Sequence, residues 1–184
     1  MMPAYGYAIV AAGLLLWAIP FFAATRNKQA AGQLDRRARW GILIEAVGYS
    51  IVWQARFWER PLPPWRAALS VLFFALAAVL SWTARRALGR HWRIDAGLSA
   101  DHELVTSGPY ALVRHPIYTS MLCLLWGTAF ILAPLPLLAI ATAVFILGTE
   151  IRVRAEDRLL AARFGQRFHD YRRRVGAYIP LIKR

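Results

Sequence analysis

The sequence predicts an all-α integral membrane protein with about five transmembrane helices. Of its 184 residues, 58% are hydrophobic and 18% are charged, whereas a soluble domain is about 45–50% apolar and about 25% charged. A chain of this length forms one domain with too small an interior to bury the excess apolar surface. The composition also excludes intrinsic disorder. A single cysteine, Cys123, excludes a disulfide framework or a thiolate-rich zinc site.

Five apolar runs define the predicted spans. They are residues 5–25, 40–57, 65–82, 117–133 and 135–149. No positive residue precedes the first run, so it lacks the start of a signal peptide and is expected to be a retained helix, kinked or ended near Pro20. The second run is weaker because it contains Glu45 and Gln54. The last two are short and joined through Pro134 and Pro136, which predicts a buried helical hairpin.

Loop charges predict the orientation. The net charge is +13, and the arginines concentrate between spans one and two, after span three, and after span five. The first 25 residues and the 134–136 turn carry no charged side chain. The positive-inside rule then places the N-terminus outside and the C-terminus in the cytoplasm. This charge is expected to meet membrane lipids, with no nucleic-acid partner.

The polar segment before the fourth span contains an Arg-His-Pro sequence. Gly108-Pro109 is a turn signal, and Pro116 directly precedes the apolar run, where proline suits the first helical turn. Arg114 and His115 are therefore expected at a helix N-terminus on the membrane surface. Free backbone N–H groups there favour an anionic group of a ligand. The alternative interpretation is that Arg-His-Pro only anchors the helix end among headgroups.

The tail after the fifth span combines arginines with a pair of acids. Arg152 and Glu156 are four residues apart and share a face if this segment is helical. Apolar residues recur at helical spacing up to a break at Gly165 and beyond it; they are Leu159, Leu160, Phe164, Phe168, Tyr171 and Val175. The alternative is an amphipathic interfacial helix, in which Glu156 merely pairs with Arg152.

In combination these residues resemble the isoprenylcysteine carboxyl methyltransferases and their bacterial relatives. The resemblance rests on residues 102–118, followed after two spans by Glu156-Asp157, Phe164-Gly165 and Tyr171. The phospholipid N-methyltransferases share the Arg-His-Pro and paired-acid pattern. The resemblance divides the single domain, 1–184, into three N-terminal spans, 1–90, and a catalytic half, 91–184. It implies a cytoplasmic cofactor pocket closed by the C-terminal amphipathic helix.

The family implies S-adenosyl-L-methionine as methyl donor and assigns site residues by position. The residues expected to bind it are His102, Glu103, Leu104, Val105, Tyr110, His115, Pro116, Ile117, Tyr118 and Glu156. Glu156 matches the acid that holds the donor's ammonium, and Arg152 matches the arginine that faces the methyl acceptor. This sequence departs from the family in having Asp157 as the second acid, Phe168 for a tyrosine, and Asp95 for a glutamine. No metal is expected.

The expected reaction is transfer of a methyl group to a lipophilic acceptor drawn from the bilayer. A carboxylate acceptor, such as an isoprenylcysteine-like thio-acid, is already ionised at neutral pH and needs no general base. An amine acceptor, as in phospholipid N-methylation, must first lose a proton. The remaining alternatives are a membrane NADPH-dependent reductase and a non-enzymatic scaffold with a basic lipid-binding tail.

Overall fold

The computed structural model describes residues 1–22, 37–53, 61–89 and 103–180. The described helices run in chain order as α1 (Ala4–Phe22), α2 (Ala38–Trp53), α3 (Pro64–Leu88), η3 (Gly108–Ala111), α4 (Pro116–Leu132), α5 (Leu135–Phe164) and α6 (Gln166–Arg174). Within these ranges there is no β-strand, only an isolated bridge between Val113 and Gly176. The predicted all-α fold is confirmed.

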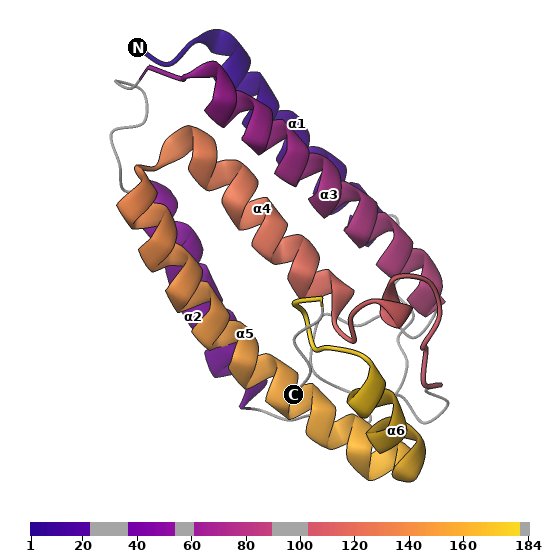
Figure 1. The fold of residues 1–184 in the computed structure, drawn as a ribbon. Helices are drawn as coiled ribbons and strands as arrows, with labels where there is room; N and C mark the ends of the chain where they lie inside the picture. Colours follow the sequence, from indigo (N-terminus) through magenta and orange to yellow (C-terminus); the bar gives the residue numbers. More distant parts are fainter. Residues whose placement is uncertain (23–36, 54–60, 90–102, 181–184) are drawn as a thin grey trace.

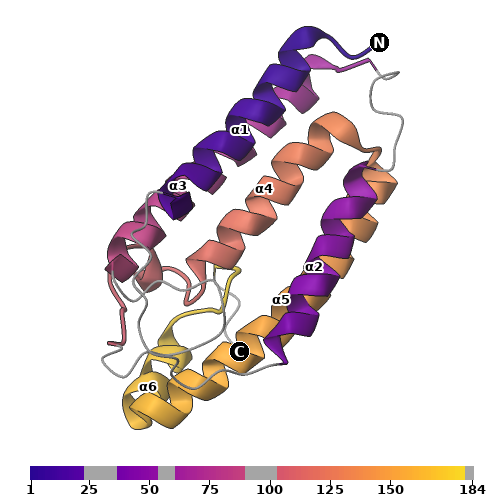
Figure 2. The ribbon, with the colours of Figure 1, turned by 180° about the vertical axis from the view of Figure 1, so that it is seen from behind.

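The five long helices run up and down in one elongated bundle. Figures 1 and 2 show α1 beside α3, α2 beside α5, and α4 between the two pairs. Successive helices alternate in direction, so the N-terminus and α6 lie at opposite ends of the bundle (Figure 1). This matches the placement of the two ends that an odd number of spans requires.

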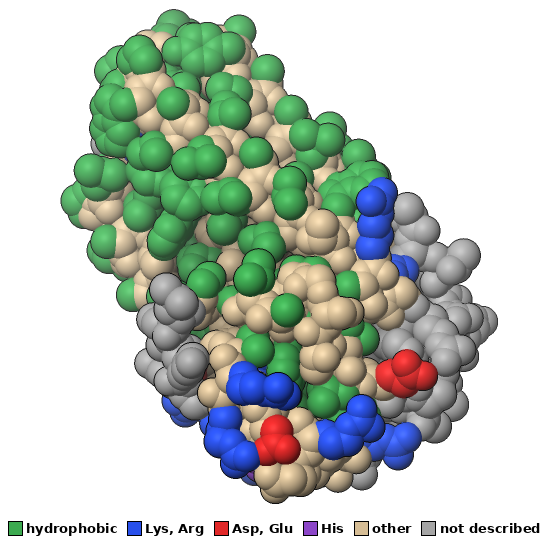
Figure 3. All heavy atoms as spheres, turned by 45° about the vertical axis from the view of Figure 1, so that its right-hand side comes forward, with side chains coloured by type: hydrophobic (Ala, Val, Ile, Leu, Met, Phe, Trp, Pro, Cys, Tyr) green, Lys and Arg blue, Asp and Glu red, His purple; other side chains and the backbone are tan. Residues whose placement is uncertain are grey.

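Apolar side chains cover the outside of the bundle, as lipid contact requires. Three helices are long and apolar enough to cross a membrane, namely α1, α3 and α5, and α4 is a shorter apolar helix. Residues such as Leu15, Val79 and Leu147 are 58–65% exposed. On the face that Figure 3 shows, hydrophobic side chains gather over the upper part of the bundle and most of the basic ones lie toward its lower end. The chain is thus a membrane protein. The count of five spans stays a prediction, because α2 has only 16 residues and contains the buried Glu45.

Helix α5 joins the fifth predicted span and the expected tail helix into one element. The apolar run from residue 135 to 149 continues without a break to Phe164, giving a helix of 30 residues. Figure 1 shows its first part beside α2 and its last part continuing to α6, and its second half carries Arg152, Glu156 and Asp157. The predicted hairpin is confirmed, since Ala133 and Pro134 alone separate α4 from α5. The predicted break is also confirmed, because Gly165 has a φ of +51°, which favours glycine.

Helices α2 and α5 pack closely through glycines. A Cβ atom on Gly41 would lie 2.5 Å from Arg152 Cγ, and one on Gly148 would lie 2.6 Å from the Gly41 carbonyl oxygen. Small residues allow such backbone approach between membrane helices. The contact fixes the height of Arg152 on α5 against α2.

The C-terminal tail folds back onto the start of α4. The backbone N–H groups of Arg114 and His115 donate to the carbonyl oxygens of Gly176 and Ala177, each over 2.8 Å. The Thr119 hydroxyl donates to the Tyr178 carbonyl oxygen over 2.7 Å. These bonds bring residues separated by about 60 positions together at the polar end of the bundle, where the tail was expected to close the pocket.

Candidate active site

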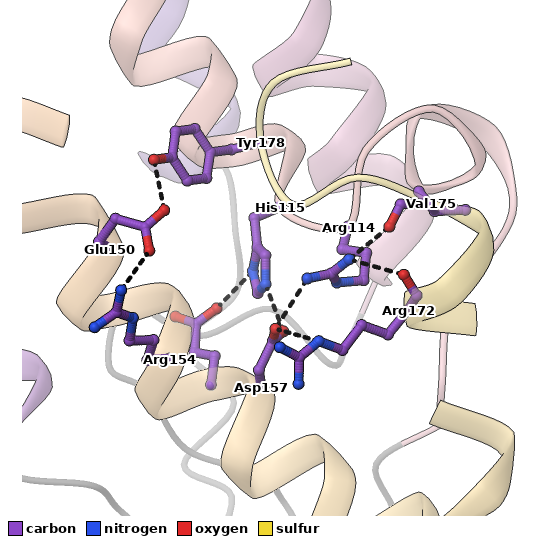
Figure 4. Close-up of polar contacts among 9 residues, drawn as sticks. Arg114, His115, Glu150, Arg154, Asp157, Arg172, Val175 and Tyr178 are labelled. Atoms are coloured by element: carbon purple, nitrogen blue, oxygen red, sulfur yellow. Dashed lines mark hydrogen bonds and ion pairs between the residues drawn. The ribbon is translucent and has the colours of Figure 1, made fainter. Parts of the chain in front are cut away.

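His115 lies between the two acids of α5. Its Nδ1 is 3.1 Å from Glu156 Oε2, and its Nε2 is 3.0 Å from Asp157 Oδ1. The His115 residue is 6% exposed and caps the N-terminus of α4. The structure therefore brings together three residues from the two segments that the sequence singled out, and Figure 4 shows the His115 ring directed at Asp157.

The two carboxylates keep this imidazole protonated. Burial alone would lower the pKa of His115, but the hydrogen bonds with Asp157 and Glu156 outweigh burial and raise that pKa to about 9. Burial likewise opposes ionisation of each acid, yet the bond to His115 holds the pKa of Glu156 and that of Asp157 below their usual values. At neutral pH the site holds an imidazolium between two carboxylates, and both ring nitrogens are donors.

Arg114 ties Asp157 to the tail. Its Nη2 donates to Asp157 Oδ2 over 2.9 Å, and its Nη1 donates to the carbonyl oxygens of Val175 and Arg172. The side chain of Asp157 is 9% exposed, whereas that of Glu156 is 27% exposed. Glu156 is therefore the acid with a face open to a ligand, and Asp157 is built into the fold.

Tyr118 connects Glu156 to Arg152. Its hydroxyl donates to Glu156 Oε1, and its ring stacks near the His115 imidazole with centroids 5.6 Å apart. The Arg152 guanidinium carbon lies 4.5 Å from the Tyr118 ring centroid, a cation–π contact. Arg152 and Glu156 thus reach the same aromatic side chain, as their four-residue spacing on one helix face predicts.

Arg152 is paired with a residue of α2. Its Nη1 donates to Glu45 Oε2 over 2.6 Å, and the Thr149 hydroxyl donates to Glu45 Oε1 over 2.9 Å. The alternative in which Glu156 merely pairs with Arg152 is wrong, because Glu156 is bonded to His115 and Tyr118 instead. Arg152 is 9% exposed, and its Nε has no hydrogen-bond partner within the described ranges.

The expected anion site at the start of α4 is largely filled by the protein itself. The N–H groups of Arg114 and His115 are bonded to the tail, and Pro116 has none. Of the predicted positions here, Ile117 keeps an N–H group for which the described residues supply no backbone acceptor. The prediction of free N–H groups at this helix terminus is wrong for residues 114 and 115, because carbonyl oxygens of the C-terminal tail accept hydrogen bonds from both.

The remaining predicted site residues divide by burial. Glu103 is exposed, and Leu104 and Val105 are half-buried in the non-helical segment before η3. The backbone N–H groups of these three residues donate to no backbone carbonyl of the described chain. Tyr110 is buried, and its carbonyl oxygen accepts from the Tyr171 hydroxyl over 2.6 Å. His102 and Asp95 lie outside the described residues.

The sequence analysis missed Glu45 and the Arg114–Asp157 pair. Glu45 was treated only as a weakness of the second span. A carboxylate in a membrane helix is by default functional and paired, and that signal was available. The Arg114–Asp157 pair spans 43 positions and has no local sequence signature.

Several known proteins are similar to this chain. The cobalt-zinc-cadmium resistance protein CzcN of Cupriavidus metallidurans is 32% identical over 145 residues, which cover 78% of this chain and 62% of that protein. A protein-S-isoprenylcysteine O-methyltransferase of Tribolium castaneum is 34% identical over 122 residues, covering 65% and 43%. Methanethiol S-methyltransferase 2 of Bradyrhizobium diazoefficiens is 38% identical over 73 residues, covering 40% and 27%. The chain thus spans 27–62% of the length of these relatives.

A family model described as phospholipid methyltransferase matches residues 65–167. The matched region contains Arg114, His115, Arg152 and both acids of α5. The predicted resemblance to isoprenylcysteine and phospholipid methyltransferases is confirmed by the family match and by the names of these relatives. Because the match covers more than half of the 184 residues, the chain belongs to the phospholipid methyltransferase family.

Proposed function

We propose that this chain is a membrane methyltransferase that uses S-adenosyl-L-methionine to methylate the carboxylate of a lipophilic, isoprenylcysteine-like acceptor. One observation carries the proposal: Glu156 is bonded to His115 and Tyr118 and is partly exposed, and Arg152, one helical turn away, lies against the same tyrosine with an Nε that has no partner among the described residues. A carboxylate that can bind the ammonium of the donor and a guanidinium that can bind the carboxylate of the acceptor are therefore adjacent, at the polar end of an apolar bundle.

The residues at this site fit the methyl donor. The donor carries an ammonium, and each oxygen of a carboxylate accepts about two hydrogen bonds. Glu156 uses one acceptor site on each oxygen, for Tyr118 and for His115, so it retains capacity for an ammonium. The backbone N–H groups of Glu103, Leu104 and Val105, which have no backbone acceptor among the described residues, suit the adenosyl part. His102, Tyr110, Pro116 and Ile117 stay predicted members of this site.

The donor supplies a methyl group whose bond to sulfur breaks, with both electrons going to sulfur, as the acceptor oxygen forms the new bond. Arg152 would hold the acceptor carboxylate by a charge-assisted bond and leave one oxygen directed at the methyl group. Glu156 would hold the ammonium of the donor. Alignment of this kind contributes about 7–11 kcal/mol in the best intramolecular cases, so positioning is the main task of the protein.

The state of His115 favours a carboxylate over an amine acceptor. An ammonium must lose its proton before it attacks. Both His115 nitrogens are bonded to carboxylates, and its pKa of about 9 keeps it protonated at neutral pH. His115 therefore cannot serve as the base for an amine, and a carboxylate acceptor needs none.

The basic end of the bundle indicates the orientation. The last turns of α3, α5 and α6 all carry arginines, and these helix ends lie opposite the N-terminus (Figure 1). By the positive-inside rule this end, with Glu156, faces the cytoplasm and the N-terminus faces outward. A reporter fused to the C-terminus and active only inside the cell tests this placement, and activity restricted to the outer face would contradict it.

The test of the donor is a titration of the detergent-solubilised protein with S-adenosylhomocysteine, S-adenosylmethionine and NADPH. Saturable binding of the two adenosyl-sulfur compounds without binding of NADPH is expected. Binding of NADPH alone would favour the reductase alternative. Binding of none of the three would favour the scaffold alternative, in which the arginines only meet lipid headgroups.

A further inference from the structure

Glu45 is a buried carboxylate in a helix that is otherwise apolar or small on its packed face. The residue is 2% exposed and lies at the contact between α2 and α5. The other buried residues of α2 are Ala38, Gly41, Gly48 and Val52. Glu45 is thus the one charged side chain on the buried face of α2 as described. Burying a charge in an apolar environment costs free energy, so such a residue indicates a function.

Both oxygens of Glu45 are directed at α5. Oε2 accepts from Arg152 Nη1 over 2.6 Å, and Oε1 accepts from the Thr149 hydroxyl over 2.9 Å. Two bonds to one element fix the direction of the carboxylate as well as its position. A charged hydrogen bond at this distance is short and strong.

Arg152 is held on three sides as a result. Glu45 accepts a hydrogen bond from Nη1, and the guanidinium carbon lies 4.5 Å from the centroid of the Tyr118 ring. The aliphatic part of Arg152 packs so closely on Gly41 that a Cβ on Gly41 would lie 2.5 Å from Arg152 Cγ. On the Nε edge of the guanidinium, by contrast, Nε is buried and has no hydrogen-bond partner in the described chain. A buried donor without a partner is costly, and an acceptor anion at that edge would satisfy it.

We propose that Glu45 is a positioning residue of the acceptor site: it fixes the Arg152 guanidinium so that its Nε edge receives the acceptor carboxylate. The proposal rests on the proposed function. Glu45 does not touch the acceptor, and it acts through Arg152. It also offsets the charge of Arg152, so its role is to set geometry rather than to increase affinity.

This role predicts a split between kcat and KM. In Glu45→Gln the amide still fills the space but no longer compensates the charge of Arg152. The guanidinium then attracts the acceptor carboxylate at least as strongly but in a less defined pose. The KM for the acceptor should stay unchanged or fall, whereas kcat should fall by about 100-fold, the loss associated with a misplacement of about 1 Å. Affinity for S-adenosylhomocysteine should stay within twofold, since Glu156 is not altered.

The experiment measures methyl transfer to N-acetyl-S-farnesylcysteine, a prenylated cysteine with a free carboxylate, by the full chain in detergent. The matched control is Glu150→Gln, the same change on α5 at a residue that bonds Tyr178 and Arg154. A double-mutant comparison adds Glu45→Gln to Arg152→Lys. If Glu45 acts through Arg152, it should lower kcat less than threefold in the lysine background. An equal loss in both backgrounds would overturn the proposal.

A second variant covers the case in which Glu45→Gln does not fold. Thr149→Val removes one bond to Glu45 and keeps both charges, and it should lower kcat by about 3- to 10-fold, the equivalent of one hydrogen bond. Wild-type kcat in Thr149→Val or in folded Glu45→Gln overturns the proposal. If the wild-type chain itself transfers no methyl group to the probe, the proposed function fails and this inference fails with it.

Discussion

Glu156 and Asp157 are adjacent carboxylates that should respond differently to amide substitution. Glu156 is 27% exposed and bonded to His115 and Tyr118, whereas Asp157 is 9% exposed and bonded to His115 and Arg114. We therefore expect Glu156→Gln to weaken ligand binding and Asp157→Asn to weaken the fold. The change is the same at both positions, so each variant is the control for the other.

The magnitudes follow from these contacts. A hydrogen bond to a charged partner contributes about 1.5–3 kcal/mol, so Glu156→Gln should weaken S-adenosylhomocysteine binding by about 10- to 150-fold. Asp157→Asn removes one charge from a buried pair, and breaking such a pair costs about 3–5 kcal/mol of stability. Its affinity for the ligand should change by less than about threefold, because Asp157 has little exposed surface from which to reach the donor.

The assay pairs a binding titration with a thermal unfolding curve for each variant. The reasoning predicts a crossed pattern, with lost affinity in one variant and lost stability in the other. Equal affinity for wild type and Glu156→Gln would refute the assignment of Glu156 to the ammonium. Glu156 would then serve only to hold His115 and Tyr118.

Three further predictions follow from the described contacts. The pKa of His115 is raised to about 9. Its contribution to stability is therefore complete below about pH 6.5, the pKa of histidine in the unfolded chain, and is lost as pH rises through about 9. Unfolding curves measured across this pH range should show the decline, and His115→Gln should flatten it. Arg152→Lys should leave S-adenosylhomocysteine affinity unchanged but lower methylation of a carboxylate acceptor about 100-fold, since lysine lacks the planar guanidinium fork. The control is Arg154→Lys, at a side chain 71% exposed, which should change neither quantity. Equal small effects of the two variants would indicate that the arginines form only a surface patch. Gly148→Ala would put a Cβ 2.6 Å from the Gly41 carbonyl oxygen, so the variant should unfold at a lower temperature, and an unchanged unfolding temperature would argue against the α2–α5 contact.

Hydropathy and turn chemistry accounted for most of the fold. The apolar runs became α1 to α5, Pro134 marked the hairpin turn, and Gly165 marked the break before α6. The span predicted for residues 135–149 and the tail helix expected to break at Gly165 form one helix, α5, because hydropathy detects where lipid contact stops and not where a helix stops. A helix that leaves the membrane continues as long as its residues favour helix.

Long-range partners were beyond the reach of local patterns. The four-residue spacing of Arg152 and Glu156 suggested a pair, but Glu45, 107 positions from Arg152, forms the bond instead. The choice depends on how α2 packs on α5, and glycine contacts decide that packing. The N–H groups of Arg114 and His115 were expected to be free, yet the tail returns from Gly176 and Ala177 to satisfy them. No local sequence pattern indicates this contact between the tail and the start of α4.

The most direct test of the account is methyl transfer itself. The full chain in detergent would be incubated with S-adenosylmethionine labelled in its methyl group and with N-acetyl-S-farnesylcysteine, vesicles containing phosphatidylethanolamine, or methanethiol. We predict label in a base-labile methyl ester of the prenylcysteine, and loss of that label with Arg152→Lys. Label in the phospholipid amine or in the thiol, with none in the ester, would contradict a carboxylate acceptor, and absence of transfer to all three would contradict the proposed function.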